Sequence, residues 1–160
     1  MKITLLCVGK TDFDFVERGV ELYSARVSHY CKFEKIYIPA LKKGATLSEV
    51  EIKNREGEQI LKYIGKSDCY SILLDERGKE LRSLELSEKL EKLFLNVGSS
   101  KDIFFVIGGA YGFSEKVYSA ANELLSLSKM TFSHQIIRVI FMEQLYRCFT
   151  IMRGEPYHHE

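Results

Sequence analysis

The segment DIFFVI, residues 102–107, runs directly into GGAYG, residues 108–112. Five of the six residues in DIFFVI are apolar, which is typical of a strand covered on both faces in a parallel sheet. Glycine permits tight turns and close approaches that a side chain forbids, so GGAYG is expected to form a compact loop. A buried strand followed by such a loop and then a helix predicts an α/β domain.

Strand-like and helix-like segments alternate along the rest of the chain. Further strands are predicted at residues 2–8, 33–38, 69–75 and 129–132, with a turn at residues 76–79. Helices are predicted where apolar residues recur at helical spacing, at residues 16–30, 48–64, 86–97, 114–125 and 136–152. Ser48 and Glu51 form a capping-box pattern for the second of these helices. The alternation predicts a mostly parallel sheet with helices on both faces.

The composition is that of one globular domain spanning residues 1–160, because the chain contains no linker-like, low-complexity or repeated segment. No apolar run is long enough for a membrane span, and the N-terminus lacks the hydrophobic block of a signal peptide. The spacing of Cys7, Cys31, Cys69 and Cys148 does not match a metal site. We therefore expect reduced thiols in a cytoplasmic protein without a metal.

The net charge of +1 is small for a protein that binds nucleic acid through charge alone. An RNA partner would therefore need a local cluster of basic residues, or recognition by shape.

Ligands on parallel α/β sheets bind beyond the carboxyl ends of the strands. This rule predicts a site formed by Leu74 and Asp75, by the loop at residues 108–112, and by the segment at residues 127–132. The loop GGxxG lacks the spacing of a dinucleotide fingerprint, and Gly9-Lys10-Thr11 lacks the first glycine of a P-loop. The glycines at 108–112 are compatible with a tight turn alone or with a backbone that lies against a ligand.

The last helix and the tail carry further candidates. His134 precedes the helix and is more typical of a cap or a packing residue than of a catalyst. Arg138 and Arg147 suit either the helix surface or contacts with phosphate. The tail RGEPYHHE, residues 153–160, concentrates aromatic and imidazole groups, which suit stacking on an unpaired base.

Several motifs together resemble the ribosomal RNA large subunit methyltransferase H family, of the SPOUT class. They are MKITL with VGK in the first ten residues, REGEQIL at 55–61, FVIGG at 105–109, LSLSKMTF at 125–132, Arg138-Val139, EQLYR at 143–147 and PYH at 156–158. The motifs occur in order from the first strand to the tail. The resemblance implies a deep C-terminal trefoil knot, a homodimer, and S-adenosylmethionine bound by the knot loops.

The resemblance also implies a reaction and its site residues. The reaction is methyl transfer to N3 of a pseudouridine in 23S rRNA of the assembled ribosome. Tyr157 and His158 are expected to position the base and to assist proton loss, and Arg138, Arg147 and His159 to contact RNA. The family can carry Arg or Lys where this chain has His159, so the charge there depends on pH. The cofactor contacts implied are Leu74, Gly108, Leu127, Ser128, Lys129, Met130, Thr131 and Phe132.

Two other functions fit the same residues. One is a SPOUT methyltransferase that acts on tRNA. The other is a dimer that binds the cofactor without catalysing transfer.

Overall fold

The computed structural model describes residues 2–44, 46–96 and 101–159. Its single five-stranded sheet has the order β2-β1-β4-β3-β5, and all neighbouring strands are parallel. The strands are β1 (Lys2–Val8), β2 (Lys32–Ile38), β3 (Cys69–Glu80), β4 (Asp102–Ile107) and β5 (Glu123–Ser126). The α/β class and the parallel sheet predicted from the sequence are confirmed.

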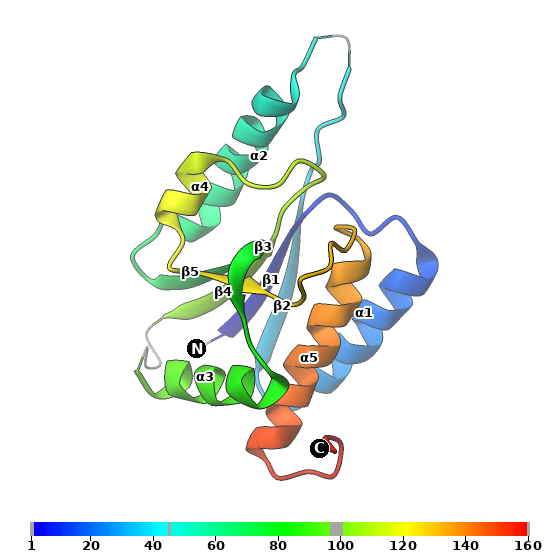
Figure 1. Ribbon diagram of the computed structural model, residues 1–160, viewed down its shortest axis with the longest axis vertical. Coiled ribbons are helices and arrows are strands. Elements are labelled where there is room, and N and C mark those ends of the chain that lie inside the picture. The colour runs from blue at the N-terminus through cyan, green and yellow to red at the C-terminus, as the bar shows by residue number, and fades with distance from the viewer. Residues whose placement is uncertain (1, 45, 97–100, 160) are drawn as a thin grey trace.

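Helices cover both faces of the sheet (Figure 1). One face packs against α1 (Asp14–Val27), α3 (Ser83–Asn96) and α5 (Ile136–Met152), and the other against α2 (Glu49–Ile64) and α4 (Glu115–Ala120). The central strand β4 serves both layers, since Phe105 belongs to the α5 side and Phe104 and Val106 to the α2 side. Successive residues of a strand point to opposite faces of the sheet. Because both faces of β4 are covered by helices, all of its inward positions are apolar and the apolar run is continuous.

The N-terminal half follows the sequence closely. The capping box of α2 is present, with the Ser48 side chain accepting from the Glu51 amide and the Glu51 carboxylate accepting from the Ser48 amide at 2.7 Å. Cys7, Cys69 and Cys148 are buried, Cys31 is half-buried, and all four are free thiols. Val97, predicted as the last apolar position of the third helix, lies outside the described residues. None of the helices in the described ranges combines the length and apolarity needed to cross a bilayer.

Three predicted boundaries after residue 75 are wrong. Helix α4 ends at Ala120 rather than near residue 125, the fifth strand is Glu123–Ser126 rather than residues 129–132, and β3 continues to Glu80 through the predicted turn. The cause is tertiary pairing. Asn122 holds the chain on β3, because its amide donates to the Ser71 carbonyl at 3.0 Å and its side-chain oxygen accepts from the Ser71 amide at 2.8 Å. Local spacing cannot report such long-range hydrogen bonds.

Strand β3 crosses β5 at a bulge. Leu74 and Lys79 both pair with Leu125, so the four residues between them leave the regular ladder. Gly78 makes this crossing possible, because a Cβ at that position would lie 2.5 Å from the Leu125 amide nitrogen. The bulge carries residues 75–77 to the carboxyl edge of the sheet.

Arg138 occupies a different place from the one predicted. Its side chain is fully buried at the start of α5. The guanidinium donates to the Val8 carbonyl at 2.9 Å, and to the Thr11 hydroxyl and the His134 carbonyl at 3.0 Å each. The guanidinium thus ties α5 to the end of β1, and a contact between Arg138 and RNA stays a prediction.

We expect Arg138→Ala to lower the free energy of unfolding by about 3 kcal/mol, because it leaves buried acceptors without donors and creates a cavity. Urea unfolding followed by circular dichroism measures this change. Arg18→Ala, an exposed arginine on α1, serves as the control and should change stability by under about 0.5 kcal/mol. An Arg138→Ala protein of unchanged stability would contradict the structural role.

Candidate functional site

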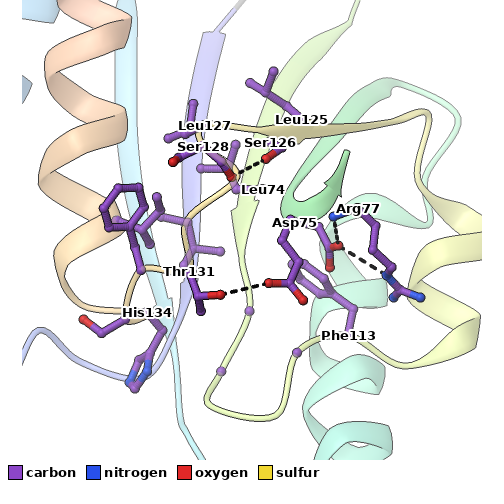
Figure 2. A pocket seen from close by; sticks show the side chains of 18 of the residues that line it. Leu74, Asp75, Arg77, Phe113, Leu125, Ser126, Leu127, Ser128, Thr131 and His134 are labelled. Carbon is purple, nitrogen blue, oxygen red and sulfur yellow. Dashed lines mark hydrogen bonds and ion pairs between the residues drawn. The ribbon is translucent and has the colours of Figure 1, made fainter. Parts of the chain in front are cut away.

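A cavity of about 770 Å³ opens at the carboxyl edge of the sheet. Three segments far apart in sequence line it: the β3 bulge, the glycine loop after β4, and the loop between β5 and α5 (Figure 2). This is the edge at which parallel α/β sheets bind ligands, and the volume is typical of a small-molecule site.

Most of the predicted cofactor contacts meet at this cavity. Seven of the eight line it, namely Leu74, Gly108, Leu127, Ser128, Met130, Thr131 and Phe132. Lys129 is exposed and is not part of the lining. Arg77, Phe113, Tyr118 and His134 also line the cavity. The sequence did not point to Arg77, because residues 76–79 were predicted as a turn, nor to Tyr118, which lies on α4.

The glycine loop is shaped by both space and conformation. Gly112 has a φ of +78°, in the left-handed region that favours glycine, and its amide donates to the Gly109 carbonyl at 3.1 Å. At Gly108 a Cβ would lie 3.2 Å from the Phe113 ring. The loop is thus a tight turn, and its backbone also forms part of a cavity wall, while its contact with a ligand stays a prediction.

A buried carboxylic acid lies behind the glycine loop. Glu56 of α2 is only 4% exposed, and its Oε1 accepts from the Leu41 amide at 3.0 Å. A Cβ at Gly109 would lie 2.6 Å from the Glu56 Oε2 atom. Burial raises the pKa of Glu56, which favours the neutral acid. Glu56 therefore occupies the space beside Gly109 that a side chain at that position would need.

The loop between β5 and α5 is ordered by its own hydroxyl groups. The Ser126 hydroxyl donates to the Ser128 carbonyl, and the Ser128 hydroxyl accepts from the Met130 amide, each at 2.9 Å. Thr131 then reaches across the cavity to donate to the Glu76 carboxylate at 3.2 Å (Figure 2). This hydrogen bond joins the loop to the β3 bulge.

The charges at the cavity are concentrated on the β3 bulge. Asp75 and Glu76 carry negative charge and Arg77 carries positive charge, so the three residues sum to −1. The pKa of Tyr118 is raised by burial and by donation of its hydroxyl to Asp75 at 2.5 Å. The pKa of His134 is lowered by burial and by nearby Arg138, so the ring is neutral near pH 7. The cavity therefore favours a ligand that carries positive charge.

The C-terminal tail folds back along α5, outside the cavity lining. The Tyr157 hydroxyl donates to Glu143 at 3.1 Å, and Arg147 also binds Glu143. The His158 Nδ1 atom lies 3.3 Å from an Arg147 terminal nitrogen, while His159 is exposed. Glu143 is six residues beyond the cavity-lining Ile137, about 9 Å of helix rise. The structure thus gathers the predicted cofactor residues together and leaves the predicted catalytic residues apart from them.

Comparison with known families decides the class of protein. A family model described as "Predicted SPOUT methyltransferase" matches residues 1–158. The chain belongs to the SPOUT methyltransferase family.

Curated relatives of this SPOUT chain carry one name. Proteins named "Ribosomal RNA large subunit methyltransferase H" are 52% identical in Parabacteroides distasonis, over all of both chains, and 52% identical in Christiangramia forsetii, over 99% of both. Together with the matching motifs they confirm the family resemblance.

Solved SPOUT-like structures share the fold at low identity. A tRNA (m1G37) methyltransferase from Aquifex aeolicus aligns with a TM-score of 0.54 and 14% identity, covering 100% of this chain and 76% of that one. A probable methylase family protein from Haemophilus influenzae aligns with a TM-score of 0.53 and 12% identity, covering 99% of this chain and 70% of that one. At such identities the likeness establishes the architecture only.

We expect Gly108→Val to weaken binding of S-adenosylmethionine, the donor that the family resemblance implies, by tenfold or more. The added side chain would meet Phe113 and the wall of the cavity. Isothermal titration calorimetry measures the dissociation constant. Gly44→Val is the matched control, since a Cβ at Gly44 meets nothing within 4 Å. Equal affinities of the two variants would place the donor elsewhere.

Proposed function

We propose that this SPOUT protein transfers a methyl group from S-adenosylmethionine to N3 of a pseudouridine in 23S rRNA, acting on the assembled ribosome. The observation that carries the proposal is the single cavity formed by Leu74, Gly108 and the loop at residues 127–132, the segments that the resemblance assigns to the donor. The name shared by the curated relatives supports large-subunit ribosomal RNA as the substrate.

The residues of the cavity fit this donor. Ile107, Leu125 and Leu127 give an apolar wall for an adenine ring, and the wall formed by Gly108 and Gly109 leaves room for close contact with backbone atoms. The negative sum of charge on the β3 bulge suits a ligand with sulfonium and ammonium groups. When bound, the sulfonium supplies an already activated methyl group, so the protein has mainly to align the acceptor.

The proposed homodimer has a candidate surface on α1, α5 and the loop before α5. Helix α5 is apolar on more than the face it buries, since Ile136, Ile137, Val139 and Ile140 are only partly buried. Exposed apolar side chains also lie at or beside α1, namely Phe13, Phe15 and Leu22, and in the loop before α5, namely Met130 and Phe132. A second copy of the chain would remove this apolar surface from water.

The β3–β5 crossing at Gly78 supports the proposed knot, because one strand passes closely over the backbone of another.

We further propose that Tyr157 and His158 complete the donor cavity of the partner subunit. In its own subunit the tail is bound to Glu143 and Arg147 and takes no part in the lining. A tail supplied in trans would bring two catalytic side chains to the exposed side of the cavity, where the RNA base must enter.

The tail residues differ in the proton chemistry open to them. Burial and hydrogen bonds raise the pKa of Tyr157, so its hydroxyl stays protonated and can donate to the base rather than accept its proton. An Arg147 guanidinium only donates hydrogen bonds, so His158 accepts at Nδ1 in the present arrangement. We propose that His158 takes the N3 proton at a ring nitrogen once the RNA is bound. Arg147 and His159 would then meet the RNA.

Methyl transfer to purified ribosomes should exceed transfer to free rRNA and to tRNA. The net charge of +1 is too small for the protein to bind free RNA through charge alone. We therefore expect it to select its substrate by the shape of the ribosome. Transfer of tritiated methyl groups, followed by mass spectrometry of 23S rRNA, measures the rate and the modified position. Faster transfer to tRNA would support the tRNA alternative, and donor binding without transfer to any of the three would support the inert dimer.

Deletion of residues 157–160 should abolish methyl transfer while donor affinity stays within about twofold. The described tail residues 157–159 do not line the donor cavity of their own subunit, whereas the deletion removes both proposed catalytic side chains. Calorimetry and the methyl-transfer assay measure the two effects.

A mixing experiment tests which subunit supplies the tail. The tail-deleted chain and Gly108→Val are each expected to be inactive, but their heterodimer combines one intact cavity with one intact tail. Recovery of activity on mixing supports a tail in trans. Absence of recovery, with heterodimers verified by native mass spectrometry, would contradict it.

A further inference from the structure

Arg77 is the one lysine or arginine in the cavity lining formed by the described residues. It stands on the β3 bulge at the rim, and its side chain is 60% exposed. Of the other arginines considered for RNA, Arg138 is fully buried and Arg147 is paired with Glu143, and neither lines the cavity. The rim of the cavity therefore has a cation that no other part of the proposed function uses.

Arg77 is held in a defined orientation. Its backbone amide and its side-chain Nε both donate to Asp75 Oδ1, at 2.9 and 3.3 Å (Figure 2). The guanidinium carbon lies 4.1 Å from the centre of the Tyr118 ring, and Tyr118 in turn donates to Asp75 Oδ2 at 2.5 Å. One face of the guanidinium is thus stacked and one edge is bonded, which leaves its outer edge toward solvent.

The stability of the fold does not account for this arrangement. Exposed ion pairs contribute little to folding, because water screens them and the side chains lose entropy. Asp75 is nearly buried at 11% side-chain exposure, whereas Arg77 lies largely in water. A long side chain fixed at the mouth of a cavity is better explained by binding, because preorganisation lowers the entropy cost of capturing a ligand.

The chemistry of the rim indicates an anionic ligand from the RNA. Asp75 and Glu76 place negative charge where the RNA backbone must approach to deliver a base, so a phosphate there requires a nearby cation. Arginine presents a rigid fork of donors that matches phosphate oxygens in pairs. Contacts of this type fix the register of the nucleic acid without reading its sequence.

We propose that Arg77, oriented by Asp75 and Tyr118, binds a backbone phosphate beside the nucleotide that enters the cavity. The inference rests on the proposed function and adds an RNA contact to it. Arg77 belongs to the same subunit as the donor cavity, so Arg77 and a tail supplied by the partner would contact the RNA from different subunits.

Methyl transfer to ribosomes by Arg77→Ala tests the proposal. We expect KM for ribosomes to rise about tenfold, and the slope of log KM against log salt concentration to fall by about one. The dissociation constant of S-adenosylmethionine should stay within about twofold. Arg77→Lys keeps the charge but loses the fork and the stacking, so it should lie between Arg77→Ala and the unmodified chain.

Lys79→Ala is the matched control, since Lys79 is an exposed cation two residues along the same strand and is absent from the cavity lining. It should leave KM and its salt dependence unchanged. An Arg77→Ala enzyme with the KM and salt slope of the unmodified chain would overturn the inference. Weaker donor binding with unchanged KM for ribosomes would also overturn it, by assigning Arg77 to the donor carboxylate. A lack of ribosome methylation by the unmodified chain would instead contradict the proposed function itself.

Discussion

The pairing of β3 with β5 on both sides of a bulge is the constraint on which the site depends. Because Leu74 and Lys79 pair with the same residue, Leu125, the chain between them is forced out of the sheet at its carboxyl edge. That excursion supplies one wall of the cavity, including Asp75 and the residues after it. It also aligns β5 so that the loop before α5 emerges opposite that wall. Gly78 permits this close pairing, because a Cβ there would lie 2.5 Å from the Leu125 amide nitrogen.

A second tie sets the position of α5 relative to the sheet. Arg138 links the start of the helix to the end of β1 and to Thr11, entirely through uncharged acceptors. Because His134 and Ile137 line the cavity and flank Arg138, the same tie fixes their wall of the site. A residue that looks like a nucleic-acid contact in sequence therefore acts as an internal brace.

Strands and helices whose signals are local could be predicted from the sequence. The capping box of α2 and the apolar run of β4 each depend on neighbours within a few residues. The errors fall where long-range contacts decide the outcome. Asn122 ends α4 by bonding to Ser71, and the β3 bulge is set by Leu125, which lies far along the chain. The burial of Arg138 likewise depends on acceptors more than 120 residues away.

The cofactor side of the site could be anticipated more completely than the rest, because parallel sheets place ligands at one edge and the motif resemblance named the loops. Arg77 and Tyr118 could not be, since no spacing rule connects a strand bulge with a tyrosine on a later helix. The tail is a different case, in which sequence indicates suitable chemistry but a single chain does not show where it acts.

Glu56 and Gly109 share a space that has room for only one side chain. The acid fills the volume that any substituent on the loop would need, and the bare backbone in turn is what lets the acid sit so deep. The two positions are therefore sterically coupled. We expect a residue larger than glycine at position 109 to occur together with a shorter side chain at position 56.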